Sequence, residues 1–458
     1  MKLDFAKPIH VHFIGIGGIS MSGLAEILLS RGFTVSGSDM KASPLTEHLA
    51  ALGATIMIGQ RASNITDDID LVVYTAAISK DNMEFEEVVV RKIPMMTRAE
   101  LLGQLMTNYE TPICVSGTHG KTTTTSMISE ILMAADADPT LSIGGILKSV
   151  GGNLRIGSSG TFVTEACEYT NSYHSFFPKI SLILNIEEDH MDFFKDLADI
   201  RNSFHTFAKL LPSDGTLIIN HAIENLSEIT GDLSSAVITF GNDAAADYHP
   251  EDITFDEMGR GTFTLVRLGK APINVKLSVI GMHNVLNACA AFALADLLNI
   301  PEGKTLQGLA NFTGTERRFE KKGTIGGVHI YDDYAHHPTE IAATLSAASK
   351  IEKKRLIVAF QPHTYTRTKA FLDDFAKALS AADMVILADI YAAREKNTIG
   401  ISSRDLLKKL EELGTEAYYF PTFDEIEAFI LENCSTGDML ITMGAGDIVN
   451  VGENLLGL

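Results

Sequence analysis

The segment GTHGKTTT, which begins at Gly117, has the residue types and spacing of a phosphate-binding turn. Gly117 and Gly120 permit a tight turn and close approach of the backbone to a phosphate, and Lys121 supplies a positive charge at an exposed loop end. The helical pattern that follows offers free N–H groups at its first turn. The G-x-x-G-K-T spacing is two residues shorter than that of the common P-loop. The sequence therefore predicts a nucleotide-phosphate site here, with a purely structural glycine turn as the alternative.

Oxygen-bearing side chains around this turn have the chemistry of a Mg²⁺ site. Thr122 follows the lysine directly, where its hydroxyl can hold an ion that bridges nucleotide phosphates. The apolar run TFVTEA ends near Glu165, and the segment ISLILNIEEDH contains Asn185 and ends at His190. Ligands of open α/β sheets bind at the carboxyl ends of strands, so these side chains should approach the loop. We expect Glu165 to bind Mg²⁺ or Mn²⁺ with Thr122, and His190 to serve a second ion or act through water, although each alone could be a capping or surface residue.

The N-terminal segment HVHFIGIGGISMSGLAEILLSRGFTVSGSD predicts a strand, a glycine turn, a helix and a second strand that ends at Asp39. This order resembles a dinucleotide-binding fingerprint, in which glycines admit a pyrophosphate and the acid binds ribose hydroxyls. Ser20 stands where the third glycine of the fingerprint would be, so a turn without a ligand remains an alternative. Two phosphate-binding turns suggest two nucleotides, one of them a carrier on the substrate.

Two further groups of polar residues occur downstream. The helical pattern GMHNVLNACAA places Asn284 and Asn287 on one face, where their amides either pair with an adenine edge or cap the helix. The segments IYDDYAHHPTE, AFQPHTYTRT, ADIYAAREK and TMGAGD look like consecutive strand tips. We expect these tips to bring Asp333, His336 and Arg367 to one rim of a sheet, together with the last glycine turn.

The organisation of the chain is that of an α/β protein. Short β-branched runs, including LVVYTAA, TLIIN, RLIVAF and ADMVILA, are followed by turns and usually by helical patterns, which predicts parallel sheets with crossover helices. A length of 458 residues favours about three domains. Polar stretches near residues 108 and 315 predict the boundaries. The predicted domains are a Rossmann-like N-terminal domain (1–107), a central P-loop domain (108–314) and a C-terminal Rossmann-like domain (315–458).

Composition excludes several classes of partner. The formal net charge of −21 opposes general binding to nucleic acid, so an anionic substrate needs local positive sites. No apolar run approaches the roughly 20 residues of a membrane span, and the N-terminus enters a strand pattern without a signal peptide. The four cysteines lack CxxC spacing, which argues against a disulfide framework or a zinc site. We expect a cytoplasmic protein that binds neither nucleic acid nor membrane and is a monomer or a weak homodimer.

Eight segments, taken in order, resemble the Mur ligase family over almost the whole chain. These segments are GIGGISMSGLAEIL, SGTHGKTTT, NIEEDHMDFF, GMHNVLNACAA, RRFE, DDYAHHPTE, QPHTYTRT and GAGD. The first turn, DDYAHHPTE and QPHTYTRT look most like the branch that adds L-alanine to UDP-N-acetylmuramate in cytoplasmic peptidoglycan precursor synthesis. The resemblance implies an ATP-dependent ligase: ATP phosphorylates the substrate carboxylate, and the amino group of L-alanine attacks the acyl phosphate, giving amide, ADP and phosphate.

The resemblance also implies residue roles. The implied ATP-binding residues are Gly117, Thr118, His119, Gly120, Lys121, Thr122, Thr123, Asn284, Asn287, Arg318 and Asp333. The implied UDP-sugar residues are Gly15, Gly17, Gly18, Ser38 and Asp39, and the amino-acid side is Tyr334, His336 and Arg367. The implied catalytic residues are Lys121, Glu165, His190, Arg318 and Asp333, with Thr122, Glu165 and His190 as metal ligands. The N-terminal domain would bind the UDP-sugar, the central domain ATP, and the C-terminal domain the amino acid as it closes.

Three alternatives remain. A sibling ligase of the same family recycles an intact tripeptide onto UDP-N-acetylmuramate, but the sequence of its first glycine turn differs from GIGGISMSGLAEIL. A non-catalytic nucleotide-binding module is disfavoured because Lys121, Glu165 and His190 are all present. An NAD-dependent oxidoreductase is suggested by the first turn alone, and both the missing third glycine and the second phosphate loop count against it.

Overall fold

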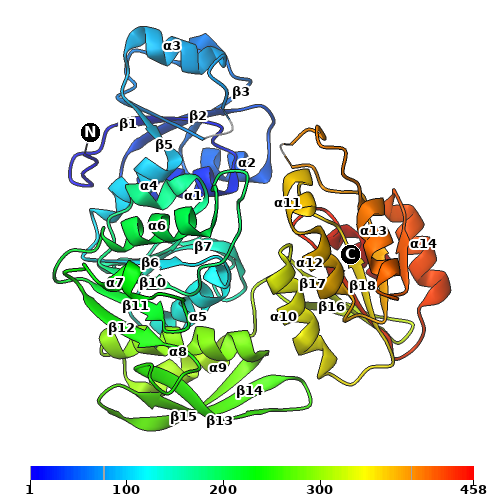
Figure 1. Cartoon of the computed structure of the whole chain (residues 1–458). Coiled ribbons are helices and arrows are strands. Elements are labelled where there is room, and N and C mark those ends of the chain that lie inside the picture. The colour runs from blue at the N-terminus through cyan, green and yellow to red at the C-terminus, as the bar shows by residue number, and fades with distance from the viewer. Residues whose placement is uncertain (1, 76–77, 394) are drawn as a thin grey trace.

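In the computed structural model of the chain, the described residues form three sheets that follow one another along the sequence (Figure 1). Ala76 and Ala77, which end the predicted strand LVVYTAA, and Arg394, in the segment ADIYAAREK, lie outside the described residues. The structure describes residues 2–75, 78–393 and 395–458. A mixed α/β fold built on three sheets confirms the predicted fold class.

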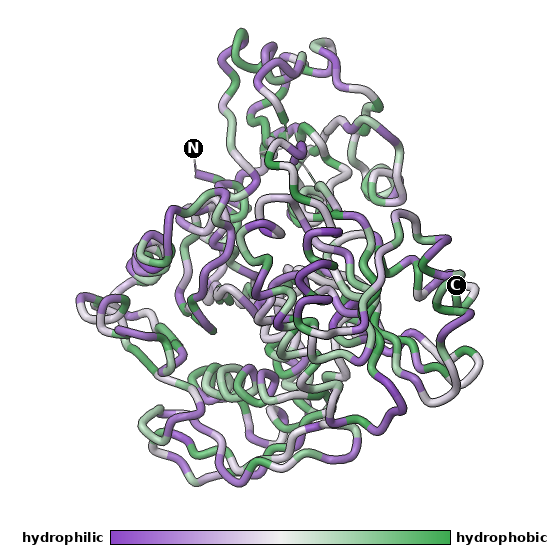
Figure 2. Tube along the Cα trace, turned by 45° about the vertical axis from the view of Figure 1, so that its right-hand side comes forward, coloured by the Kyte–Doolittle hydropathy of each residue, from purple (hydrophilic) through white to green (hydrophobic). Residues whose placement is uncertain are grey.

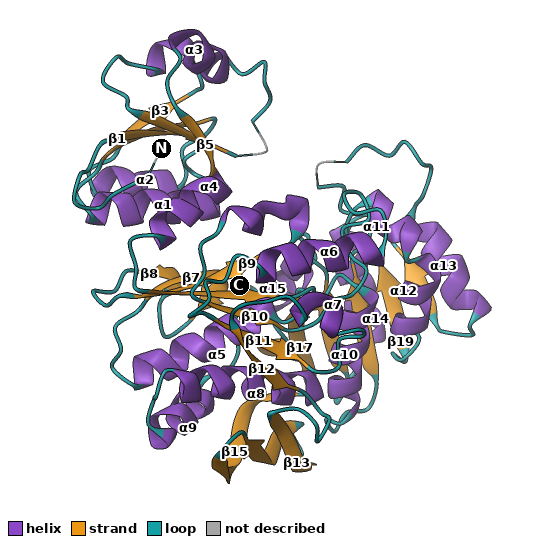
Figure 3. Cartoon of the chain, turned by 60° about the vertical axis from the view of Figure 1, so that its left-hand side comes forward, coloured by secondary structure: helices purple, strands orange, loops and turns teal. Residues whose placement is uncertain are grey.

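The first sheet is parallel, with strand order β3-β2-β1-β4-β5. The connection order reverses beside β1, and a Rossmann-type sheet binds its ligand in the crevice at that point. Helices α1, α2 and α4 lie on one side of the sheet and α3 on the other (Figure 3). The elements are β1 (His10–Ile14), α1 (Ile19–Ser30), β2 (Thr34–Asp39), α2 (Pro44–Ala51), β3 (Thr55–Ile58), η1 (Ala62–Asn64), β4 (Leu71–Tyr74), α3 (Met83–Arg91), β5 (Met95–Thr97) and α4 (Arg98–Met106).

The second sheet has the order β15-β14-β13-β12-β11-β10-β6-β9-β7-β8. Strand β6 lies between β10 and β9, parallel to both, so the carboxyl ends of these three strands meet at one edge. Helices α5, α8 and α9 contribute to one apolar core of this sheet, and α6 to another. The elements are β6 (Thr111–Ser116), α5 (Lys121–Ala134), β7 (Thr140–Leu147), β8 (Gly152–Arg155), β9 (Thr161–Ala166), η2 (Tyr169–Ser175), β10 (Ile180–Ile183), α6 (Leu197–Ala208), β11 (Thr216–Asn220), α7 (Ser227–Thr230), β12 (Ala236–Phe240), β13 (Tyr248–Phe255), β14 (Arg260–Arg267), β15 (Lys270–Ile280), α8 (Met282–Leu297) and α9 (Glu302–Asn311).

The third sheet has the order β16-β17-β21-β18-β19-β20. One face packs on α10, α12 and α13 and the other on α14 and α15, so its central strands are buried on both sides. The elements are β16 (Glu320–Ile325), β17 (Val328–Asp333), α10 (Pro338–Ser349), β18 (Leu356–Phe360), α11 (Tyr365–Ala370), α12 (Leu372–Leu379), β19 (Met384–Leu387), α13 (Ser403–Glu412), β20 (Ala417–Tyr419), α14 (Phe423–Asn433), β21 (Met439–Met443) and α15 (Val449–Leu456).

The prediction of parallel sheets throughout is wrong at the sheet edges. Strands β13, β14 and β15 form an antiparallel meander, and β8 and β16 pair antiparallel with their neighbours. Antiparallel neighbours need only a short turn, so no crossover helix marks them in the sequence. The available signal was the alternation of polar and apolar residues at 262–265 (TFTL). Burial alternates along Arg260–Arg267 in the same way, because only one face of that strand is covered.

The first two sheets are joined by an apolar core, which includes residues of α1, α4, η2 and α6. Tyr109 packs on Phe162 with ring centroids 5.0 Å apart, and the Arg31 guanidinium donates to the carbonyl of Gly157 at 3.2 Å. Hydrophobic and hydrophilic segments alternate along the chain (Figure 2), as expected where each element turns one face inward. Among the described helices, none combines the length and apolarity needed to cross a bilayer.

We predict that Gly103→Ala destabilises the protein although alanine is the better helix former. A Cβ at Gly103, in α4, would overlap the carbonyl oxygen of Ser175 in η2. Relieving this overlap should cost about 1–3 kcal/mol, seen as a lower midpoint of thermal unfolding. Gly303→Ala, in α9, is the matched control because a Cβ there meets nothing within 4 Å. Equal midpoints for the two variants would contradict a close approach of α4 to η2.

Candidate functional site

The phosphate loop, residues 117–120, connects β6 to α5. Gly117 and Gly120 adopt φ angles of 141° and 83°, which glycine tolerates and other residues rarely adopt. Space is also short: a Cβ would lie 3.0 Å from the Cβ of Leu184 at the first glycine and 3.0 Å from Oδ1 of Asn287 at the second. The loop therefore needs both glycines, and the second brings the loop against α8.

Lys121 is held by a buried carboxylate. Its ammonium donates to the carbonyls of Gly117 and Thr118 at 2.5 and 3.1 Å and pairs with Glu168 at 3.0 Å. Burial alone lowers the pKa of Lys121, but the Glu168 carboxylate outweighs this effect and raises the pKa above its ordinary range. The expectation of an exposed loop end is therefore wrong, because the lysine is enclosed and paired.

Thr122 and Glu165 lie together, as the sequence predicts for a pair of Mg²⁺ ligands. The Thr122 hydroxyl donates to Glu165 at 3.0 Å, and the amide of Gly144 donates to the other carboxylate oxygen at 2.5 Å. Burial raises the pKa of Glu165, while these hydrogen bonds and the Lys121 charge oppose the rise. A hydroxyl and a half-buried carboxylate are oxygen donors of the kind that Mg²⁺ prefers, so the pair fits that ion.

His190 lies beside Glu168. Its Nε2 is 3.8 Å from Glu168, and its ring stacks on Tyr169 with centroids 4.5 Å apart. Burial lowers the pKa of His190, which favours the neutral imidazole that binds metal ions. Glu168 thus connects His190 to Lys121. Of the predicted metal ligands, Thr122 and Glu165 contact each other, whereas His190 lies beside Glu168, which was not predicted.

A cavity of about 540 Å³ lies between the central and C-terminal parts of the chain. Two of its residues, Asn284 and Asn287, are buried on α8. The Asn287 side-chain amide donates to Oδ1 of Asn284 at 3.2 Å, and the Asn284 side-chain amide donates to the Ile280 carbonyl at 2.8 Å. A larger cavity of about 870 Å³ between α6 and α10 does not include the loop glycines. Predicted residues that line the smaller cavity are His119, Gly120, Thr123, Asn284, Asn287, Arg318 and Asp333.

Asp333 and Arg318 enter this cavity from the C-terminal sheet. The Asp333 carboxylate accepts from the amides of Ala335 and Phe319 at 2.7 and 2.9 Å, and burial raises its pKa to about 6. The Arg318 guanidinium lies 5.4 Å from the ring centre of Tyr334 and 3.8 Å from Glu340. Arg318 therefore brings a positive charge to the cavity, and Asp333 shapes the backbone around it.

His119 connects the phosphate loop to α10. Its two ring nitrogens lie 3.3 Å from Glu340 and 3.5 Å from Glu187. Burial lowers the pKa of His119, but hydrogen bonds and charges from Glu187 and Glu340 outweigh it and raise the pKa to about 9. The ring also faces His337 with centroids 4.8 Å apart. The loop residue that the family resemblance assigned to ATP is thus also a contact between the central and C-terminal sheets.

The predicted amino-acid side lies near His190 and adjoins the cavity through Tyr334, whose ring is next to Arg318. Arg367 donates to Asp189 at 2.7 Å and contacts His363 at 3.2 Å. Burial raises the pKa of Asp189, but the Arg367 guanidinium outweighs it and holds the pKa well below its usual range. Burial lowers the pKa of His336, whose ring lies against His363, to about 4. Arg367 and His336 thus come together, and Tyr334 joins them through its ring contact with His336.

The glycine turn of the first sheet is closed by Asp39. The amide of Gly17 donates to this carboxylate at 2.9 Å, and the amide of Gly15 donates to the Ser38 carbonyl at 2.8 Å. Gly18 caps α1, so the free amides of that helix face the crevice. Ser38 is fully buried, and its hydroxyl donates to Glu84 at 2.5 Å. The structure therefore gathers the glycines and Asp39 at the turn but directs the Ser38 side chain inward.

Sequence reasoning missed the carboxylates that hold the positive groups. Glu168 follows β9, Asp189 follows β10, and Glu340 lies in the first turn of α10. Each lies within or beside a segment already singled out at a strand end. A lysine or arginine at a buried site requires a partner charge, and that requirement was the available signal.

Three family models match the chain in order. They are described as Mur ligase family, catalytic domain (residues 10–110), Mur ligase middle domain (115–295) and Mur ligase, glutamate ligase domain (317–446). Together these matches cover most of the sequence.

Individual relatives match over the same length. UDP-N-acetylmuramate--L-alanine ligase of Agathobacter rectalis is 60% identical over 455 residues, which cover 99% of each chain. The crystal structure of UDP-N-acetylmuramate-alanine ligase of Thermotoga maritima superposes with a TM-score of 0.81 at 30% identity, covering 98% of each chain. A murein peptide ligase of Psychrobacter arcticus superposes with a TM-score of 0.71 at 26% identity, again covering 98% of each chain. The phosphate loop, its carboxylate partners and these matches together place the chain in the Mur ligase family.

Proposed function

We propose that the protein is an ATP-dependent ligase that joins L-alanine to the carboxylate of UDP-N-acetylmuramate. The observation that carries the proposal is Lys121, fixed at a glycine loop beside the Thr122 and Glu165 oxygens. This arrangement is suited to a nucleotide triphosphate whose terminal phosphoryl group is transferred. The choice of L-alanine and of the sugar nucleotide is supported by the 60% identical relative from Agathobacter rectalis, which carries that activity in its name.

The residues divide the reaction among three regions. The loop amides and Lys121 would hold the ATP phosphates, and the γ-phosphoryl group passes to the substrate carboxylate, releasing ADP and giving an acyl phosphate. The amino group of L-alanine then displaces phosphate to form the amide. Mg²⁺, when bound by Thr122 and Glu165, supplies neutralising charge, and His190 would serve a second ion. Arg318 adds a positive charge from the C-terminal side.

The substrates would enter from different sheets. Gly15, Gly17 and Gly18 would let the UDP phosphates approach the start of α1, whose first amides are free, while the glycine amides and Asp39 hold the turn closed. Tyr334, His336 and Arg367 would form the side that receives L-alanine. We propose domains at 1–107, 108–314 and 315–458, with closure of the last domain excluding water from the acyl phosphate. We place this reaction in cytoplasmic peptidoglycan precursor synthesis, as the names of the relatives suggest for the pathway.

The reaction is tested by phosphate release from ATP and Mg²⁺ with the purified full chain. Release should require UDP-N-acetylmuramate and L-alanine together, because the acyl phosphate forms only on the sugar nucleotide and turns over only with an amine. Each substrate alone is the control. Release with the intact tripeptide instead of L-alanine would assign the protein to the recycling reaction. Binding of ATP without any release would indicate a non-catalytic module.

We predict that Lys121→Ala lowers kcat at least about 1000-fold, since it removes the charge at the transferring phosphoryl group. The same change leaves Glu168 buried without its partner and should lower stability by about 3–5 kcal/mol. The double variant Lys121→Met with Glu168→Gln should recover most of the stability but no activity. Thermal unfolding and steady-state kinetics on both proteins separate the two effects, and substantial turnover by either folded variant would refute the role given to Lys121.

We predict that Arg367→Gln lowers kcat by about 100-fold, because it releases Asp189 and misplaces the groups around His190. The matched control is Arg355→Gln, which breaks an Arg–Asp pair of similar geometry, to Asp438 at 2.6 Å, within the C-terminal sheet. That control should lose stability and retain kcat. If both variants lose activity equally, the contact between Arg367 and Asp189 has no special part in the reaction.

A further inference from the structure

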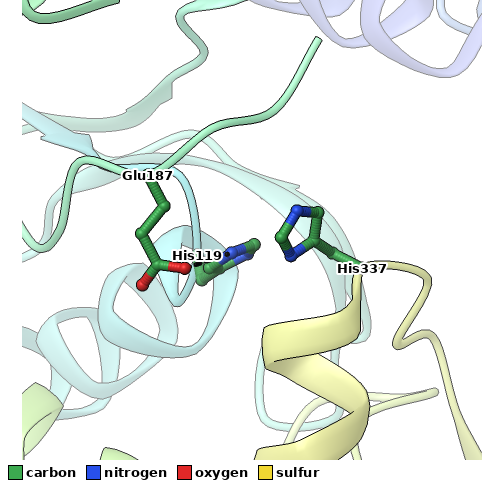
Figure 4. A group of neighbouring side chains, drawn as sticks. All are labelled: His119, Glu187 and His337. Atoms are coloured by element: carbon green, nitrogen blue, oxygen red, sulfur yellow. Dashed lines mark ion pairs between the residues drawn. The ribbon is translucent and has the colours of Figure 1, made fainter. Parts of the chain in front are cut away.

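Three side chains outside the proposed Mg²⁺ pair meet where the phosphate loop touches the C-terminal sheet (Figure 4). His119 lies in the loop, Glu187 lies in the segment after β10, and His337 is the N-cap residue of α10. One donor atom from each residue lies within 4.8 Å of the others. Two imidazoles and one carboxylate form a different donor set from the oxygen pair of Thr122 and Glu165.

The ring of His119 is arranged like that of a metal ligand. Its Nδ1 lies 3.3 Å from Glu340, and its buried Nε2 has only a long contact of 3.5 Å with the Glu187 carboxylate. Histidines that bind metal ions usually donate one ring N–H to a carboxylate or a carbonyl, while the other nitrogen binds the ion. Because Glu187 and Glu340 raise the pKa of His119, the ion must displace a proton from the second nitrogen when it binds. Glu340 occupies that outer position for His119.

His337 and Glu187 are supported in the same way. Nε2 of His337 lies 3.0 Å from the Glu188 carbonyl, to which it can only donate, so the lone pair is on Nδ1. Nδ1 accepts only a long contact of 3.3 Å from the amide of Thr339. The Thr339 hydroxyl donates to Glu187 at 2.8 Å and orients the carboxylate. Each of the three candidate ligands therefore has an outer partner that fixes it.

We propose that His119, Glu187 and His337 form a second metal site, for a divalent transition-metal ion of the Zn²⁺ class. Two imidazoles with a carboxylate suit Zn²⁺ or Co²⁺, whereas Mg²⁺ prefers oxygen. Three protein ligands leave a fourth tetrahedral position open. The proposal does not depend on the identity of the amino acid or the sugar nucleotide.

The site has a mechanical consequence because its ligands come from two sheets. A tetrahedral ion with ligand distances of about 2.0–2.2 Å needs donor atoms about 3.4 Å apart. The donors lie within 4.8 Å of one another, so the ion draws the start of α10 toward the phosphate loop. Zn²⁺ bound here therefore holds the C-terminal sheet against the central sheet.

The test is titration of the full chain with Zn²⁺ by calorimetry, and with Co²⁺ by visible absorption, in excess Mg²⁺. The wild-type protein should bind one Zn²⁺ and give the intense absorption of four-coordinate Co²⁺. His337→Ala and Glu187→Gln should each weaken Zn²⁺ binding at least about 10-fold. His329→Ala is the matched histidine control. His329 lies on β17 and its ring is hydrogen-bonded to the Thr324 hydroxyl, so this variant should bind Zn²⁺ as the wild-type protein does.

Glu165→Gln, which removes the proposed Mg²⁺ carboxylate, should leave Zn²⁺ binding intact. Wild-type protein that binds no Zn²⁺ overturns the proposal. So does binding that is lost in Glu165→Gln but kept in His337→Ala, because the ion then occupies the Mg²⁺ pair. If the ligand variants fail to fold, X-ray absorption of the Zn²⁺-loaded wild-type protein decides, since fewer than two imidazole ligands contradicts the site.

Discussion

The ion pair between Lys121 and Glu168 is the contact on which the site depends. It joins the loop after β6 to the segment after β9, and the same carboxylate lies beside His190 from the segment after β10. A buried charge is costly without its partner, so the two residues fix each other's position. The lysine also holds two loop carbonyls, at Gly117 and Thr118. The shape of the phosphate loop, the start of α5 and the position of His190 thus depend on one glutamate.

The other positive groups of the site follow the same pattern. Arg367 pairs with Asp189, and both His119 and Arg318 approach Glu340. In a chain of net charge −21, an anionic substrate meets cations that already have carboxylate partners. Its phosphates therefore share each cation with a fixed anion, and the cations need little rearrangement when substrate arrives. Groups held in place before the reaction act on the transferring phosphoryl group without the cost of reorganisation.

The sequence was sufficient for what is encoded locally. The glycine spacing of the phosphate loop and the apolar runs of β6, β9 and β10 predict a loop with Glu165 and His190 beside it. The structure brings both residues to this edge, although β9 and β10 flank β6 on opposite sides instead of pairing with each other. The partners were not predictable in this way, because Glu340 reaches His119 from a helix more than two hundred residues away. The Ser38 hydroxyl shows the same limit, because its partner is Glu84, a residue distant in sequence. The hydrophobic periodicity of the sequence predicts which residues are buried, but it does not predict which buried polar groups contact one another.

Glu340 gives the clearest physical link between the nucleotide loop and the C-terminal sheet. It lies in the first turn of α10, accepts from the amide of His336 at 3.1 Å, and faces both His119 and Arg318. Any ligand that changes the charge around His119 therefore acts on a carboxylate that belongs to the other sheet. A ligand shifts a conformational equilibrium only by the difference in its contacts between the two states, and the cavity between these sheets supplies such contacts on both sides. An acyl phosphate must be shielded from water, and the contacts of His119 and Arg318 with Glu340 bring both walls of this cavity together around the place where the nucleotide would lie.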